Sequence, residues 1–67
     1  MLTRFYNDYR IVVSKIDTNI GKGFRAVFCI PKDNGLTECH QLYETYRRKK
    51  PSEVVEDVKR IIDSLTY

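Results

Sequence analysis

A single amphipathic stripe near the end of the sequence limits what this chain can build. Its apolar side chains recur at the spacing of an α-helix, with charged residues between them: Val54, Val55, Val58, Ile61, Ile62 and Leu65. Pro51 suits the first turn of such a helix, where its missing N–H needs no partner. One helix covers only one face of a sheet, so a sheet built from the preceding residues keeps its other face open.

Two segments rich in β-branched and aromatic residues, 9–16 and 24–30, are predicted to be strands. Residues 17–23, which contain Asn19 and two glycines, are predicted to form the loop between them. Because side chains alternate across a strand, the apolar face that the helix should cover consists of Tyr9, Ile11, Val13, Phe24, Ala26, Phe28 and Ile30.

Residues 37–49 fit two interpretations. Cys39, Leu42, Tyr43 and Tyr46 have helical spacing, but Asn34-Gly35 just before them is a strong hairpin signal. Two strands alone make a marginal sheet, so we predict a third strand, bulged because its alternation is imperfect. The predicted fold is therefore α+β: a three-stranded antiparallel sheet with one C-terminal α-helix packed on one face (β-β-β-α). The alternative is β-β-α-α, and either fold makes residues 1–67 a single small domain.

The length of 67 residues argues against an enzyme. A chain this short buries only about 60% of its unfolded surface, which leaves little room for a substrate cavity with a supporting shell. With 42% hydrophobic and 31% charged residues the composition is that of a globular protein. No apolar run is long enough to span a membrane, and the first residues lack a secretory signal. We therefore expect a soluble, cytoplasmic protein with no membrane association.

The residues that carry chemistry are few and poorly spaced. Cys39 and His40 are adjacent, so on a strand they point to opposite faces, and with Cys29 they do not give a metal-ligand spacing. Gly21-Lys22-Gly23 lacks the spacing of a phosphate-binding loop. We expect no catalytic residue, metal, cofactor or small-molecule substrate. In the cytoplasm both cysteines should be thiols, and a cross-strand disulfide is the alternative in a secreted context.

Basic residues point to nucleic acid as a partner. Residues 1–50 carry ten Lys and Arg against five Asp and Glu, a net charge of +5, while residues 51–67 carry −2. The run Arg47-Arg48-Lys49-Lys50 is suited to phosphates. Arg10 and Arg25 lie on the predicted open face, where they can contact bases, and Tyr43 and Tyr46 can stack on unpaired bases. The leading hypothesis is a small non-enzymatic regulatory module that binds nucleic acid.

The same open face also suits a protein partner. Val12, Ile16, Val27 and Cys29 make it more apolar than an ordinary solvated surface. The alternative function is therefore a protein–protein interaction module, either a homodimer or an adaptor of the antitoxin or inhibitor kind.

The predicted element order resembles two known families. In the DNA-binding domain of plant ethylene-response factors and of some integrase N-termini, a three-stranded sheet enters the major groove and strand arginines contact bases. Arg10 and Arg25 are the nearest equivalents, although this chain has no tryptophan, which that family has. HicB-type antitoxins are similar too, with a helix start like residues 50–55. Both resemblances rest on element order, which does not fix function, so the sequence is assigned to neither family.

Overall fold

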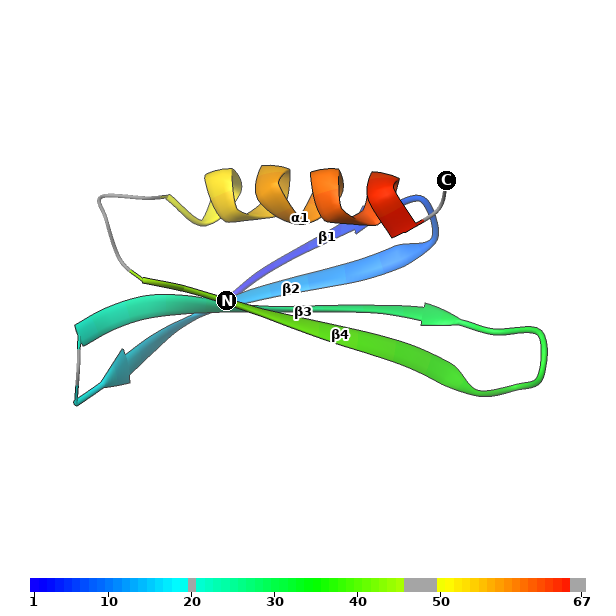
Figure 1. Cartoon of the computed structure of the whole chain (residues 1–67), viewed down its shortest axis with the longest axis horizontal. Helices are drawn as coiled ribbons and strands as arrows, with labels where there is room; N and C mark the ends of the chain where they lie inside the picture. Colours follow the sequence, from blue (N-terminus) through cyan, green and yellow to red (C-terminus); the bar gives the residue numbers. More distant parts are fainter. Residues whose placement is uncertain (20, 46–49, 66–67) are drawn as a thin grey trace.

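The computed structural model describes residues 1–19, 21–45 and 50–65. Four strands and one helix follow one another along the chain: β1 (Leu2–Tyr6), β2 (Tyr9–Thr18), β3 (Gly21–Pro31), β4 (Thr37–Thr45) and α1 (Pro51–Leu65). The strands form one antiparallel sheet in the order β1-β2-β3-β4, and α1 lies against one of its faces (Figure 1). The fold is therefore α+β, as predicted, with an antiparallel sheet and one C-terminal helix.

The prediction of three strands is wrong, because residues 2–6 form a further strand at the edge of the sheet. β1 pairs with β2 from Leu2↔Val13 to Tyr6↔Tyr9. Asn7 and Asp8 connect the two strands with positive φ angles of 48° and 69°. A two-residue hairpin turn with φ above zero at both positions matches the twist of its strands, and Asn and Asp tolerate this conformation best after glycine.

The hairpin between β3 and β4 is confirmed. The Gly35 N–H donates to the Lys32 carbonyl at 3.1 Å, and the Lys32 N–H donates to the Leu36 carbonyl at 2.7 Å. Gly35 has a φ of 82°, which a residue with a Cβ rarely adopts. Residues 37–45 are therefore a strand, and the alternative fold β-β-α-α is wrong.

The predicted irregularities of the sheet are absent from the described strands. β3 and β4 pair without a bulge from Gly23↔Thr45 to Pro31↔Thr37. The segment expected to be a loop between residues 17 and 23 is mostly strand, because β2 continues to Thr18 and β3 begins at Gly21. Longer strands satisfy more backbone hydrogen bonds in the ladder, which a seven-residue loop would leave to water.

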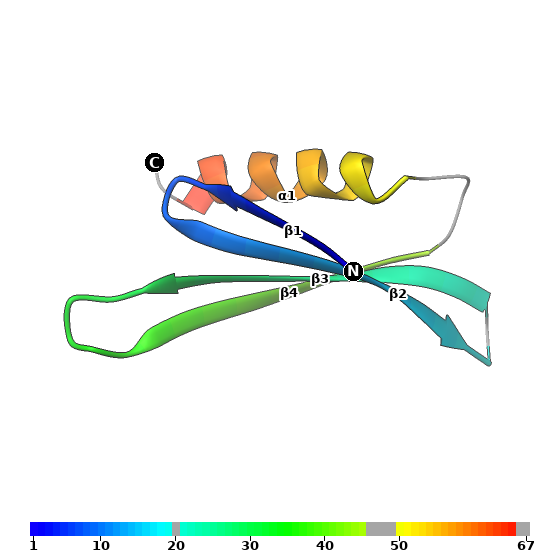
Figure 2. The ribbon, with the colours of Figure 1, turned by 180° about the vertical axis from the view of Figure 1, so that it is seen from behind.

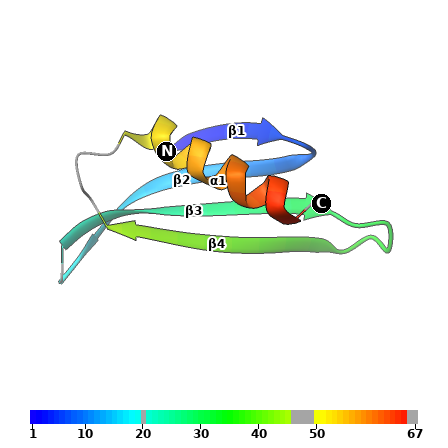
Figure 3. The same cartoon turned by 45° about the horizontal axis from the view of Figure 1, so that its top comes forward.

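The core lies between α1 and the sheet, as predicted. Its buried residues come from β2, β3 and the helix: Tyr9, Ile11, Val13, Phe24, Ala26, Phe28, Val54, Val55, Val58 and Ile62. Figure 2 shows from behind that α1 stays on one side of the sheet. Figure 3 shows that it runs over β1, β2 and β3 and leaves β4 beside it. Within the described ranges, no helix has the length and apolar character needed to cross a membrane.

Candidate binding face

The face of the sheet that α1 leaves open is organised in rows across the strands. Directly opposed residues of antiparallel strands share a face, so the register defines each row. The first row crosses all four strands through Phe5, Arg10, Cys29 and Cys39, and the second through Thr3, Val12, Val27 and Gln41. The third contains Ser14, Arg25 and Tyr43, and Ile16 lies beyond it, opposite Gly23. We call this surface the open face.

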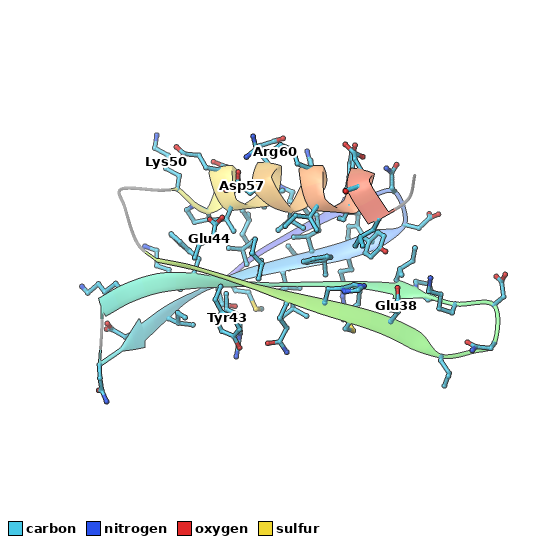
Figure 4. All side chains as sticks on the ribbon, viewed as in Figure 1. Glu38, Tyr43, Glu44, Lys50, Asp57 and Arg60 are labelled. Atoms are coloured by element: carbon cyan, nitrogen blue, oxygen red, sulfur yellow. A yellow bond between two sulfur atoms is a disulfide. The ribbon has the colours of Figure 1, made fainter. Side chains whose placement is uncertain are left out.

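Two exposed aromatic side chains on the open face each lie beside an arginine. Phe5 on β1 is 74% exposed and is directly opposite Arg10, while Tyr43 on β4 is 61% exposed and is directly opposite Arg25. The Tyr43 hydroxyl donates to Gln41 Oε1 at 2.8 Å, which holds the ring over the face. In Figure 4 Tyr43 points away from the helix, whereas its neighbour Glu44 points toward it. Each edge strand of the open face thus carries an aromatic ring beside an arginine of the neighbouring inner strand.

The charge of the open face is positive in the part of the chain that the structure describes. Arg10 and Arg25 are its charged residues there, and no carboxylate lies on it. Neither guanidinium forms an ion pair or hydrogen bond with a described residue. Without a counterion among the described residues, the two guanidinium groups keep their N–H donors for a ligand.

The centre of the open face is apolar. Val12, Ile16, Val27 and Cys29 are half-buried against one another, because β-branched side chains pack on neighbouring strands. Cys29 and Cys39 face each other across β3 and β4 and form a disulfide. The prediction that both cysteines are thiols is wrong, and the cross-strand alternative is confirmed. The prediction rested on an assumed reducing compartment, whereas the hairpin register places the two sulfur atoms in contact.

The structure brings together only part of the predicted nucleic-acid site. Arg10, Arg25 and Tyr43 share the open face with all four predicted protein-interface residues. Lys50 does not, because it lies immediately before α1 on the helix side of the sheet (Figure 4). Tyr46 and residues 47–49 lie outside the described residues. Phe5 was not predicted, although the alternation of residues 2–6 before a polar Asn-Asp pair is the signal for its strand.

His40 lies on the helix side of the sheet, opposite in direction to Cys39, as its position on a strand predicts. Its ring stacks on Phe28 with centroids 5.4 Å apart, and its Nε2 lies 3.3 Å from Glu38 Oε2. This hydrogen bond, together with the Lys32 ammonium 3.4 Å away, lowers the pKa of Glu38. Over the described residues, no three His, Cys, Asp or Glu side chains gather as a metal site. The cluster is thus a surface network beside the core.

No known family model matches the chain, and neither a curated protein nor a solved structure is significantly similar to it. The sheet also has one strand more than the two families that its predicted element order resembles. Its function is therefore inferred from the open face itself.

Proposed function

We propose that this protein is a small module that binds single-stranded nucleic acid on the open face. The observation that carries the proposal is that each exposed aromatic ring lies opposite an arginine that forms no ion pair with a described residue: Phe5 opposite Arg10, and Tyr43 opposite Arg25. Non-specific binding of single strands combines cations that contact phosphates with aromatic rings on which bases stack.

The layout of the open face favours a single strand over a duplex. Phe5 and Tyr43 lie on opposite edge strands, in the first and third rows of the open face, and about 20 Å apart at ordinary sheet spacings. A chain of unpaired nucleotides that crosses between them passes over Val12 and Val27, which offer apolar contact to bases and sugars. Bases in a duplex are already stacked, so they cannot use the aromatic rings. A duplex would also meet only two cations on the described part of this face.

The experiment is a titration of fluorescent oligonucleotides, single-stranded and duplex, at several salt concentrations. We expect Phe5→Ala and Tyr43→Ala each to weaken single-strand binding about five- to a hundred-fold, the loss that corresponds to one stacked base. Arg10→Gln and Arg25→Gln should each reduce the slope of log K against log salt by about 0.7, the value for one phosphate contact to a single strand.

Matched variants separate these roles from general effects. Arg4→Gln removes one positive charge, as Arg10→Gln does, but Arg4 is on the helix side of β1. This variant should therefore leave the slope of log K against log salt almost unchanged. Phe5→Leu keeps an apolar side chain without a ring and should lose most of the affinity that Phe5→Ala loses. Equal effects of Arg4→Gln and Arg10→Gln, or the absence of salt-dependent binding up to about 100 μM protein, would refute the proposal.

The half-buried aliphatic centre supports a second candidate, a protein interface. Aromatic residues and arginine are enriched in such interfaces, and other charged residues are depleted from their centres. Val27→Asp places a carboxylate in the middle of this surface. If the partner is a protein, Val27→Asp should abolish the complex at every salt concentration, whereas loss of Arg10 should mainly slow association.

The absence of enzymatic activity and a cytoplasmic location stay predictions. Disulfides persist mainly outside reducing compartments, so the state of Cys29 and Cys39 in cells tests the location. Rapid alkylation of a cell extract distinguishes the two cases: modified thiols support the cytoplasm, and cysteines that react only after reduction contradict it.

A further inference from the structure

The outer edge of β4 carries backbone groups that no described strand uses. Cys29 and Cys39 have Cα atoms 4.1 Å apart, the spacing of a non-hydrogen-bonded pair in an antiparallel ladder. Lys32 and Leu36, one end of the same register, share a hydrogen bond. Even-numbered residues of β4 therefore bond to β3, and the N–H and C=O groups of the odd-numbered residues 39, 41 and 43 point outward.

Apart from two glutamates on its helix side, β4 lacks the features that usually protect an edge strand. Natural edges are short, bulged, covered by a helix, or interrupted by Lys or Pro. β4 has nine residues and a regular register, and it contains neither Lys nor Pro. α1 packs over β1, β2 and β3 and leaves β4 uncovered (Figure 3). The other edge, β1, has five residues and packs under α1.

We propose that β4 pairs with β4 of a second copy of this chain, antiparallel, to form a continuous eight-stranded sheet. A two-fold axis perpendicular to the sheet keeps both helices on the same side and both open faces on the other. Each copy then supplies the same outward N–H and C=O groups to its partner, so the edge is complementary to itself.

The side chains of β4 select one register. Centring the pair on Gln41 would place Glu38 opposite Glu44 twice, and directly opposed like charges destabilise a sheet. Centring it on Leu42 instead brings the two half-buried Leu42 side chains together at the closer, non-hydrogen-bonded spacing. It also places His40 opposite Glu44 and Gln41 opposite Tyr43. This register avoids the directly opposed glutamates and pairs two apolar side chains at its centre, so the register centred on Leu42 is the expected one.

This pairing joins the two open faces along their Tyr43 edges. The row that contains Arg25 and Tyr43 would then continue into the row that contains Val27 and Gln41 of the second copy. The inference does not depend on nucleic-acid binding, because it rests on the edge alone. Its test accordingly uses the protein without any ligand.

The mass in solution, measured by light scattering from micromolar to millimolar protein, should double from the 7.9 kDa of one chain. Gln41→Pro removes one outward N–H that β3 does not use, so it should return the mass to that of the monomer. Thr3→Pro is the matched control, since its N–H points outward on β1, and the dimer should persist. A dimer that survives Gln41→Pro, or a monomer at millimolar concentration, would overturn the proposal.

Amide hydrogen exchange of the unmodified protein gives a second reading that does not depend on whether a proline variant folds. The N–H groups of Gln41 and Tyr43 should exchange at least tenfold more slowly at high than at low protein concentration. Those of Thr3 and Phe5 should be unaffected by concentration. Concentration-dependent protection that instead appears at the amides of Val12 and Val27 would indicate face-to-face association and overturn the edge pairing.

Discussion

Cys29 on β3 and Cys39 on β4 lie directly opposite each other and form a disulfide in the first row of the open face. The bond joins the strand at the centre of the core to the edge strand that α1 does not cover. It spans ten residues of sequence, so it closes the β3–β4 hairpin rather than linking distant parts of the chain. The disulfide therefore acts mainly on the stability of β4.

Replacing both cysteines by serine should lower the free energy of unfolding by about 2–3 kcal/mol, because a short loop is no longer closed in the unfolded chain. Urea unfolding followed by circular dichroism measures the change. A reducing agent should destabilise the unmodified protein to the same extent and leave the double variant unaffected. Equal midpoints with and without reductant in the unmodified protein would contradict this.

The fold was predictable from the sequence wherever a local pattern was strong. The helical stripe that includes Val58 and Ile62, and the turn at Asn34-Gly35, each specified an element by itself. β1 was missed because five residues with one turn give too short a pattern for periodicity to stand out. The turn that follows it, Asn7-Asp8, contains no glycine. The turn therefore depends on two positive φ angles that the sequence signals only weakly.

The candidate site was predicted in part for a similar reason. Arg10, Arg25 and Val27 followed from alternation within strands that were recognised. Phe5 did not, because its strand was absent from the prediction. The Cys29–Cys39 bond depends on the pairing of β3 with β4, which is a tertiary relationship. The register set by the hairpin turn at Asn34-Gly35 was the available signal for it.

Two isoleucines, one on α1 and one on the open face of the sheet, should differ in their contribution to stability. Ile62 is fully buried between α1 and the sheet, so Ile62→Ala should cost about 2–5 kcal/mol through lost burial and a cavity. Ile16 is half-buried on the open face, so Ile16→Ala should cost well under half as much. Chemical unfolding of the two variants side by side measures the difference. Similar losses would mean that the open face is covered in solution.

The contact between β1 and the helix should weaken at high pH. The Tyr6 hydroxyl donates to Asp63 Oδ1 at 2.8 Å, and this hydrogen bond is the main cause that raises the pKa of Tyr6 above 10.0. A pKa raised by folding means that the stabilisation is complete below pH 10 and is lost as the pH rises through the folded-state value. The free energy of unfolding, measured between pH 8 and pH 11, should therefore decline as the pH rises through the range in which tyrosine titrates.

Tyr6→Phe is the matched variant for this decline. It keeps the ring over which Lys59 Nζ lies, 5.4 Å from the centroid, and removes only the hydroxyl. The variant should be less stable near neutral pH, and its free energy of unfolding should fall less steeply above pH 10 than that of the unmodified protein. Asp63→Asn should return the tyrosine titration toward its ordinary value. An unchanged tyrosinate absorbance titration in Asp63→Asn would show that the hydrogen bond does not form.

At the other end of the pH range, Glu38 on β4 should titrate below its ordinary value of 4.5. The hydrogen bond from His40 is the larger cause, and the nearby Lys32 ammonium is the next. Folding that lowers the pKa of a carboxyl gives stability that is present above 4.5 and lost as the pH falls through the folded-state value. His40→Phe keeps an aromatic ring on Phe28 but cannot donate to the carboxylate, so it should raise the pKa of Glu38 more than Lys32→Met does. Carboxyl chemical shifts followed by NMR during an acid titration measure both changes. If Lys32→Met had the larger effect, charge attraction rather than the hydrogen bond would hold Glu38 ionised.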